Sequence, residues 1–377
     1  MKKARLDEIE ILRGIAFLAV VLQHVIGGIF SQPGLSSSAI LAGTTFLGLT
    51  RFAVPLFVFI TGVVLFYNYD GELHYRSFLR KRFSQVVLPY LAWTVFYYVW
   101  VSFLSGTGPS TTWEELLNLL KLALTGRASY HLWFMVMIIP FYLLFPLFKK
   151  LLSKERKPVV NLIAAASVLV VNGFLVFALS KGWIVSDHPF LQTLVIDYLD
   201  RNFLFWTFYF VMGGLVGLYY DKWKKIVQKT WLIGLLLSGV CLYMIYAKIT
   251  GILSLRDRDL YLYAANVSAP LRPLMMGTIL ILIVLAFALA MGIARRSGLS
   301  VPSRILIAFG RYSFGAYLIH AFVLRSTNEL AKSYLSWLNV YGQAAVSFVL
   351  CAAISLFLCL WISRMKLTVG EAWVGKI

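Results

Sequence analysis

The sequence predicts an all-α protein, a polytopic bundle of about ten membrane-spanning helices. Of its 377 residues, 60% are hydrophobic and only 14% are charged, whereas about a quarter of a soluble domain is charged. The mean hydropathy is +0.79. Apolar runs of about 20 residues, enough to cross a bilayer, recur from one end of the chain to the other. A water-soluble core of this size would need far more polar surface to cover it.

Ten apolar runs have the length of a membrane-crossing helix, and each is predicted to form one. They lie near residues 9–30, 44–67, 85–104, 131–149, 158–179, 203–220, 231–250, 268–292, 304–324 and 338–362. The longest connections between them, near residues 105–130, 180–202 and 250–268, are expected to be loops, which could shape a pocket for an extracytoplasmic partner or simply join the spans. A single integral-membrane domain is predicted over residues 1–377, with no soluble domain appended.

The first helix is predicted to be retained rather than cleaved as a signal peptide. Basic residues followed by an apolar run and small residues would suit a signal peptide. Three acidic residues, Asp7, Glu8 and Glu10, nevertheless crowd the region before the apolar run, and Arg13 interrupts it. These charges favour a permanent first span.

Charge along the connections predicts the topology. The connections on the N-terminal side of the bundle hold 22 of the 35 Lys and Arg residues. By the positive-inside rule, this side and therefore both termini are cytoplasmic. The net charge of +19 is thus mainly a topology signal, and no nucleic-acid partner is expected.

A basic stretch, YRSFLRKRFSQVVLPY, leads into the third span. Its pattern is typical of an amphipathic helix at the membrane surface that is attracted to anionic lipid. A cytoplasmic site for an anionic ligand explains it equally well, and the sequence leaves both interpretations open.

Arg13 and His24 lie within the first predicted span, where charged and titratable groups are costly. Eleven residues separate them, which places them within about 20° of one helix face and about 16 Å apart. A lone histidine could simply form a hydrogen bond between helices. An arginine on the same face favours a polar path along the helix.

Other polar residues fall in the outer half of their spans under this topology. Five side chains are predicted to share one cavity there: His24, Arg51, His131, Arg272 and His320. Arg311 lies nine residues before His320, about 180° away on an ideal helix. It is therefore expected near the cytoplasmic end, where it could join Arg13.

The residues alone favour a two-ended site, with arginines below and histidines above. Arginine is suited to phosphate recognition, and histidine is suited to general-base chemistry near neutral pH. A structural polar network or a transport pathway remains an alternative. The three cysteines lie within predicted spans, and no zinc, nucleotide-loop or serine-nucleophile motif occurs, so no metal site is expected.

Five blocks of the chain resemble, in order, the membrane acyltransferase-3 family of bacterial O-acyltransferases. They are RLDEIEILRGIAFLAVVLQH, RFAVPLFVFITG, FLRKRFSQVVLPY, YHLWFMVMIIPFYLLFPLF and FGRYSFGAYLIH. The most specific feature is an arginine, ten residues and a histidine in the first span, matched by Arg13 and His24. The resemblance extends over nearly the whole chain.

This resemblance implies a multi-pass protein of the bacterial plasma membrane that transfers an acyl group from cytoplasmic acyl-CoA to an extracytoplasmic hydroxyl. His24 would be the catalytic base, Arg13 would help to hold the CoA donor, and Arg51 would be a second important arginine. Four further residues are expected to bind the donor or line the cavity: Arg272, Arg311, His131 and His320.

The resemblance also implies the partners of the reaction. Acetyl-CoA, or else succinyl-CoA, is expected as co-substrate, with no permanently bound cofactor. The acceptor would be an envelope glycan or another hydroxyl compound, and the lipid bilayer surrounds the protein. A polysaccharide exporter or flippase is the main alternative, and a membrane receptor is a more distant one.

Overall fold

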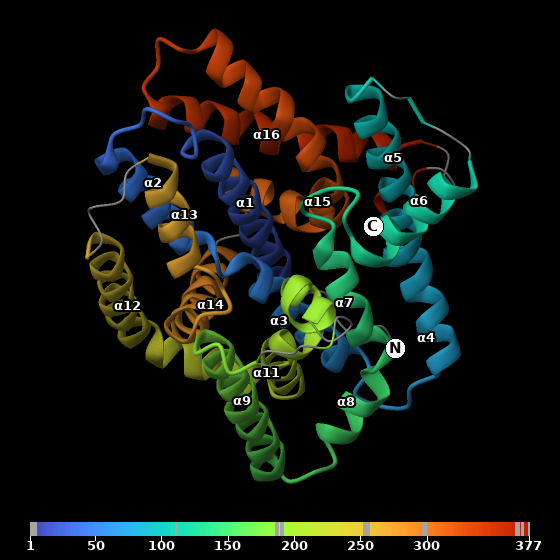
Figure 1. Ribbon diagram of the computed structural model, residues 1–377. Coiled ribbons are helices and arrows are strands. Elements are labelled where there is room, and N and C mark those ends of the chain that lie inside the picture. Colours follow the sequence, from blue (N-terminus) through green and yellow to red (C-terminus); the bar gives the residue numbers. More distant parts are fainter. Residues whose placement is uncertain are drawn as a thin grey trace.

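The chain is all-helical in a computed structural model, which describes residues 6–106, 108–109, 112–184, 188, 192–251, 257–295, 300–365, 370 and 373–375 (Figure 1). The described residues contain no β-strand. The first half holds α1 (Asp7–Ile29), α2 (Ser37–Thr50), α3 (Ala53–Asn68), α4 (Tyr75–Arg82), η1 (Phe83–Val87), α5 (Leu88–Leu104), α6 (Trp113–Thr125), α7 (Trp133–Leu143), α8 (Phe145–Leu151) and α9 (Pro158–Ser180). The second half holds η2 (Thr193–Asp197), η3 (Leu199–Arg201), η4 (Phe203–Trp206), α11 (Thr207–Leu218), α12 (Tyr220–Thr250), α13 (Asp257–Val267), α14 (Pro273–Ala294), α15 (Val301–Tyr334) and α16 (Val340–Ser363).

The predicted fold class is confirmed, and all ten predicted segments contain helix. Among the described residues, eight helical segments are long and apolar enough to cross a membrane. The pair α7 and α8, bent by 59° at Leu144, forms a ninth span if it crosses as one unit. The segment Phe203–Leu218 is helical and apolar but shorter than a full span. The protein is thus a multi-pass membrane protein. Helix length and apolar composition give eight or nine spans among the described residues.

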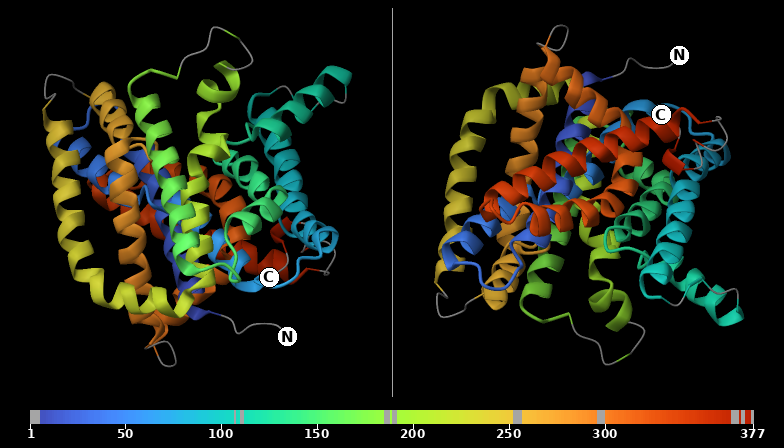
Figure 2. Two further views of the ribbon diagram at one scale, coloured as in Figure 1. Left: turned by 90° about the horizontal axis from the view of Figure 1, so that it is seen from below. Right: turned by 90° about the horizontal axis from the view of Figure 1, so that it is seen from above.

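Two connections that were expected to be loops contain helices, α6 and α13. The ends of α6 carry clear local signals. The Thr112 side chain accepts a hydrogen bond from the Glu115 amide, 3.4 Å away, and Gly126 closes the helix in the left-handed conformation at φ 66°. The connection therefore folds into a helix that projects from the body of the protein beside α5 (Figure 2).

The helix α1 lies at the centre of the bundle and packs against α15, α3 and α14. Its backbone approaches α15 closely at two glycines. A Cβ atom at Gly14 would overlap the carbonyl oxygen of Leu306, and one at Gly310 would overlap that of Glu10. Small residues allow such close contact between membrane helices. This crossing brings the Arg13 end of α1 next to Arg311 of α15.

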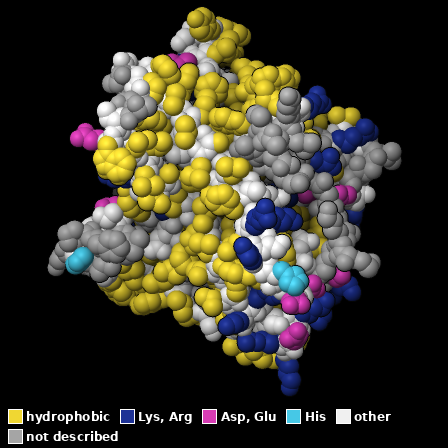
Figure 3. Space-filling view, turned by 90° about the vertical axis from the view of Figure 1, so that its right-hand side faces the viewer, with side chains coloured by type: hydrophobic (Ala, Val, Ile, Leu, Met, Phe, Trp, Pro, Cys, Tyr) yellow, Lys and Arg dark blue, Asp and Glu magenta, His cyan; other side chains and the backbone are white. Residues whose placement is uncertain are grey.

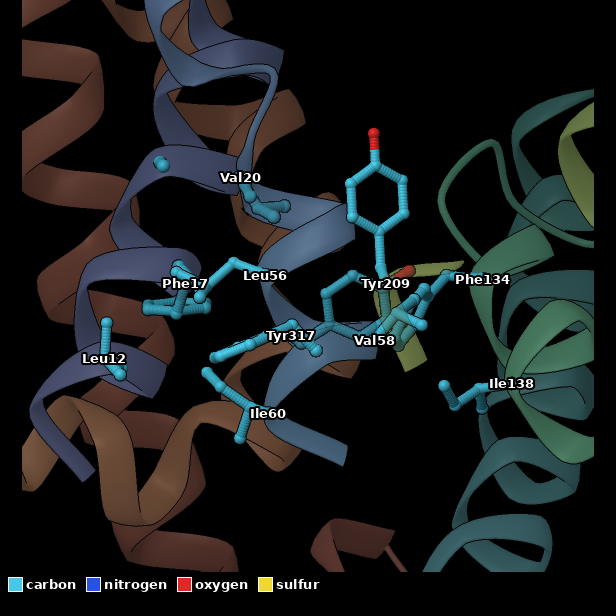
Figure 4. Packing of buried hydrophobic residues seen from close by; sticks show 14 of the residues in the cluster. Leu12, Phe17, Val20, Leu56, Val58, Ile60, Phe134, Ile138, Tyr209 and Tyr317 are labelled. Carbon is cyan, nitrogen blue, oxygen red and sulfur yellow. The ribbon is translucent and has the colours of Figure 1, made fainter. Parts of the chain in front are cut away.

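The helices α3 and α11 form a second close pair, in which the GGLVG sequence of α11 (residues 213–217) provides small residues at the contact. Added Cβ atoms at Gly213 and Gly217 of α11 would overlap carbonyl oxygens of Phe59 and Val63 in α3. Figure 4 shows side chains of α3 lying between those of α1 and α7. The helix α3 thus connects the central helix to the rest of the core.

The peripheral helices expose apolar side chains. Only 22% of the most apolar window of α9 and 17% of that of α12 is buried within the protein. A helix that is apolar all round and so little buried faces lipid. On the face drawn in Figure 3, a broad hydrophobic area adjoins a region where Lys and Arg side chains gather. This division is typical of a protein surface that passes from acyl chains to lipid headgroups.

Candidate active site

The helix α1 carries Arg13 near its start and His24 in its last two turns. The Arg13 guanidinium forms an ion pair with Glu10 one turn earlier, with Nη1 and Oε1 3.1 Å apart. The Arg13 side chain remains 31% exposed because it lines a cavity. The two residues that the sequence singled out therefore lie in different parts of the candidate site.

This cavity, the Arg13 cavity, has a volume of about 270 Å³ and lies among α1, α3, η1, α7 and α15. Three guanidinium groups line it, from Arg13, Arg82 and Arg311. Among its described lining residues none is acidic, although Glu10 pairs with Arg13 from behind. Arginine forms bidentate hydrogen bonds with phosphate and carboxylate groups. The walls therefore suit an anionic ligand.

Arg82 belongs to the basic stretch before the third span. Its guanidinium carbon lies 5.4 Å from the ring centroids of both Phe78 and Tyr142, so the two aromatic rings hold it in place. Its Nε is buried without a hydrogen-bond partner. The sequence left this stretch open as a membrane-surface helix or as a site for an anionic ligand. The structure places one of its arginines, Arg82, in the wall of the Arg13 cavity.

Three histidines from different helices meet in a cluster further along α1, and we call it the histidine cluster: His24, His131 and His320. The ring centroids of His24 and His320 are 5.4 Å apart, and those of His131 and His320 are 4.8 Å apart. His24 is half-buried, whereas His131 and His320 are 1% and 0% exposed. His24 is therefore the member of the cluster with the best access for a substrate.

Backbone contacts fix the rings of the two buried histidines. The Tyr317 carbonyl oxygen contacts Nδ1 of His320. Since a carbonyl only accepts hydrogen bonds, this nitrogen carries the proton and Nε2 keeps its lone pair. The Tyr317 hydroxyl donates to the His131 carbonyl, and His131 Nδ1 lies 3.1 Å from the Ser129 hydroxyl. The Nε2 atoms of both His131 and His320 are buried without a partner.

Aromatic rings surround the cluster. Tyr130 lies 4.8 Å from His24, and Tyr97 lies 5.3 Å from His131, both measured between ring centroids. Tyr317 is shared, because it contacts both buried histidines and also lines the Arg13 cavity. The cluster is thus connected to that cavity through a single side chain.

A second cavity, the Trp133 cavity, has a volume of about 480 Å³. It adjoins the cluster through chain neighbours, since Gln23 precedes His24 and Trp133 follows His131 by two residues. Its polar or aromatic lining residues are Gln23, Arg51, Trp133, Asp197, Asp200, Arg201 and Trp206. Asp197, Asp200 and Arg201 belong to the connection near residues 180–202, which the predicted topology places outside the cell, and Ala269, Pro270 and Leu271, between α13 and α14, complete the wall.

Arg51 ends α2 at the break before α3 and points into this region. Its Nη2 donates to the Ala265 carbonyl at 3.3 Å, and its Nε is buried without a partner. It follows Thr50, whose carbonyl accepts a hydrogen bond at 2.6 Å from Gln23, the residue before His24. Arg272 behaves differently, because its guanidinium bonds Asn266 in the preceding turn, with Nε and the Asn266 carbonyl oxygen 3.4 Å apart.

The structure therefore brings together some of the expected residues and separates others. His24, His131 and His320 are adjacent, Arg51 is linked to the His24 region through the Gln23–Thr50 hydrogen bond, and Arg13 and Arg311 share one cavity. No contact described in the structure joins Arg272 to the histidines. Sequence reasoning did not single out Tyr317 or Trp133.

Comparison with known proteins identifies relatives of the whole chain. A family model described as an acyltransferase domain matches residues 6–364. YfiQ of Bacillus subtilis (strain 168), named as a membrane-bound acyltransferase, is 24% identical over 99% of this chain and 95% of its own. Proteins of Staphylococcus aureus (strain MRSA252) and Staphylococcus epidermidis, both named for poly-beta-1,6-N-acetyl-D-glucosamine export, are each 22% identical. Those matches cover 95% and 96% of this chain, and 94% and 90% of the relatives.

No solved structure matches the chain.

Proposed function

The chain belongs to the acyltransferase-3 family of multi-pass membrane proteins, and on this premise we propose that it is an acyl-CoA-dependent O-acyltransferase. The donor is acetyl-CoA or succinyl-CoA, and the acceptor is a hydroxyl of an envelope glycan. One observation carries the proposal. Near the histidine cluster lie two cavities of different chemistry, one with three arginines and no acidic residue in its described lining, the other with two carboxylates, two arginines, two tryptophans and an amide.

The donor side of the reaction uses the Arg13 cavity. Coenzyme A carries phosphate groups, which match the guanidinium groups of Arg13, Arg82 and Arg311. Under the predicted topology this cavity opens toward the cytoplasm, where acyl-CoA is made. The thioester would then extend past Tyr317 toward the histidine cluster.

His24 acts as the base in the proposed transfer. It takes the proton of the acceptor hydroxyl while that oxygen attacks the thioester carbonyl carbon. The C–S bond breaks, the acyl group remains on the acceptor oxygen, and the coenzyme A thiolate leaves and recovers the proton from His24. General-base assistance contributes about 10²–10⁴-fold to such reactions.

His320 supports His24 from the buried side. Its Nε2 lone pair, set by the Tyr317 carbonyl contact, gives the cluster a second proton-accepting atom next to the base. Arg51 supplies a positive charge on the same side, suited to stabilising negative charge that develops on the carbonyl oxygen.

The proposed function is tested with purified protein, radiolabelled acetyl-CoA and then succinyl-CoA. We expect binding together with slow hydrolysis in the absence of an acceptor. Replacement His24→Ala should remove turnover, and Arg13→Gln should weaken donor binding. The matched controls are His74→Ala and Arg304→Gln, which change exposed residues outside both cavities. The proposal would be refuted if neither acetyl-CoA nor succinyl-CoA bound to the protein.

Export of a polysaccharide is a second candidate function, because two relatives are named for it. The two functions differ in their need for acyl-CoA. Proteoliposomes that move an oligosaccharide across the membrane without acyl-CoA, and with His24→Ala as well as the unchanged protein, would favour export. Loss of every activity in the absence of acyl-CoA favours acyl transfer.

A further inference from the structure

The Trp133 cavity has balanced charge, unlike the Arg13 cavity. Two carboxylates, Asp197 and Asp200, stand against two guanidiniums, Arg51 and Arg201. Asp200 and Arg201 form an ion pair with Oδ1 and Nη1 2.5 Å apart. Asp197 and Arg51 are the charged lining residues with no ion pair among the described residues. Asp197 is exposed and has no described partner. A polyanion would lose its hydration and meet Asp197 there, so the cavity disfavours it.

The cavity also combines flat apolar surface with hydrogen-bonding groups. The rings of Trp133 and Trp206 lie 5.8 Å apart, measured between centroids, and Trp133 is the more exposed of the two. Carboxylates accept hydrogen bonds from hydroxyls, and guanidinium and amide groups donate to them. A saccharide has both features that this wall would recognise, apolar C–H faces and hydroxyl edges.

The occupant of this cavity would lie within reach of the histidine cluster. Gln23 donates to the Thr50 carbonyl at 2.6 Å, which anchors its side chain and leaves its amide oxygen available to accept a hydrogen bond. Gln23 directly precedes His24 on α1, and both Gln23 and Arg51 line the cavity, whereas none of the three histidines is among its described lining residues. A hydroxyl held beside Gln23 would therefore lie one residue along α1 from the proposed base.

A smaller cavity of about 300 Å³ lies next to the Trp133 cavity. Arg201 lines both, and the smaller cavity adds Thr125, Tyr198 and Asn202. Arg201 is well ordered at this junction, with its Nε bonded to the Thr125 carbonyl at 2.5 Å and its guanidinium 5.1 Å from the Tyr198 ring centroid. Together the two cavities offer room for more than one sugar unit.

We propose that the Trp133 cavity is the acceptor subsite and that it selects a neutral saccharide chain over an anionic polymer, an assignment that rests on the proposed acyltransferase function. Trp133 provides the apolar platform, and Asp197, Gln23 and Arg51 provide the polar contacts. Arg201, at the junction, directs the chain into the smaller cavity. The specificity of the enzyme for its acceptor is therefore set by the connection near residues 192–202 and by the start of α7.

The test measures saccharide binding without acyl-CoA, by saturation-transfer NMR and calorimetry on the full-length protein in detergent. The neutral probes are tetrasaccharides of β1,6-linked N-acetylglucosamine, of β1,4-linked N-acetylglucosamine and of glucose, and the anionic probe is a glycerol phosphate oligomer. We expect at least one neutral probe to bind, with its saturation transfer reduced in both Trp133→Leu and Asp197→Asn. We expect an affinity loss of about tenfold in Asp197→Asn, the usual scale for one hydrogen bond to a charged group, and a clear loss in Trp133→Leu, which removes most of the apolar platform.

The matched control is Asp221→Asn, which removes a carboxylate that is 89% exposed on α12, away from both cavities. Asp197 is also exposed, so its conservative replacement is not expected to disturb folding, which elution volume checks. Tighter binding of the glycerol phosphate oligomer, failure of all neutral probes, or equal binding by Asp197→Asn and Asp221→Asn would each overturn the proposal.

These outcomes are separable from failure of the proposed function. Saccharide binding is read without donor, so it reports on the Trp133 cavity even if the protein transfers no acyl group. Hydrolysis of acetyl-CoA by the unchanged protein is read without saccharide, so it reports on the donor half alone. Loss of the second signal with retention of the first would leave a saccharide-binding membrane protein that is not an acyltransferase.

Discussion

The Arg13 cavity and the Trp133 cavity adjoin one histidine cluster but differ in the chemistry of their walls. Three guanidiniums and no acidic lining residue surround the first, whereas opposite charges balance in the second. Their origins differ too, since the first lies between helices of the core and the second is closed by two connections. Under the proposed assignment, changes in these connections can alter the acceptor while the donor end stays constant.

The largest expected effect comes from removing the proposed base in the histidine cluster. Replacement of His24 by Ala removes the only half-buried histidine of the three and should lower the transfer rate about 10²–10⁴-fold. Binding at both cavities should persist. Single-turnover kinetics with labelled acetyl-CoA checks this, with His74→Ala as the control. Normal turnover would remove His24 from the mechanism.

The donor half is tested by Arg13→Gln, which removes one of three guanidiniums. We expect the Kd for acetyl-CoA to rise about tenfold, because a hydrogen bond to a charged group contributes about 1.5–3 kcal/mol. Calorimetry at two salt concentrations measures the loss. An unchanged Kd, equal to that of Arg304→Gln, would contradict a donor role for Arg13.

The close contact of α1 with α15 shapes the Arg13 cavity. A substitution at this contact should therefore affect the Arg13 cavity more than the Trp133 cavity. Gly310 lines the cavity, and the Cβ of Gly310→Ala would overlap the Glu10 carbonyl. We expect a loss of about 1–3 kcal/mol in stability, typical of overpacking. Thermal unfolding in detergent measures it. The control is Gly239→Ala in α12, where an added Cβ meets nothing within 4 Å.

The smallest expected effect concerns the connection between the Arg13 cavity and the cluster. Tyr317→Phe removes the hydroxyl that donates to the His131 carbonyl and keeps the ring. A lost hydrogen bond of this kind costs about 1 kcal/mol, so we expect a several-fold lower kcat with little change in the KM for acyl-CoA. A change confined to KM would show that Tyr317 acts on the donor alone.

The sequence predicted the local features well. Among the described residues, apolar length was enough to locate every helical segment that corresponds to a span, and Arg13 and His24 lie on one helix as predicted. The resemblance to the acyltransferase family was also confirmed. These features depend on neighbours in the chain, where periodicity and side-chain type carry the information.

Features that depend on distant segments were harder to predict. The meeting of His131 with His320 depends on how α7 lies against α15, and nothing local to either residue indicates it. The bend at Leu144 and the helix α6 also escaped prediction, although Thr112 and Gly126 marked the ends of α6. The residues that line the Trp133 cavity could not be predicted as a set, because they come from α1, the break between α2 and α3, the start of α7 and two connections.

We propose that the two cavities receive substrates from opposite sides of the membrane. Proteoliposomes with labelled acetyl-CoA sealed inside and a neutral N-acetylglucosamine oligosaccharide outside test this directly. With protein oriented so that its termini face the lumen, we expect labelled acetyl groups on the external oligosaccharide, and none with His24→Ala. Acetylation that occurs only when both substrates share one compartment would contradict it.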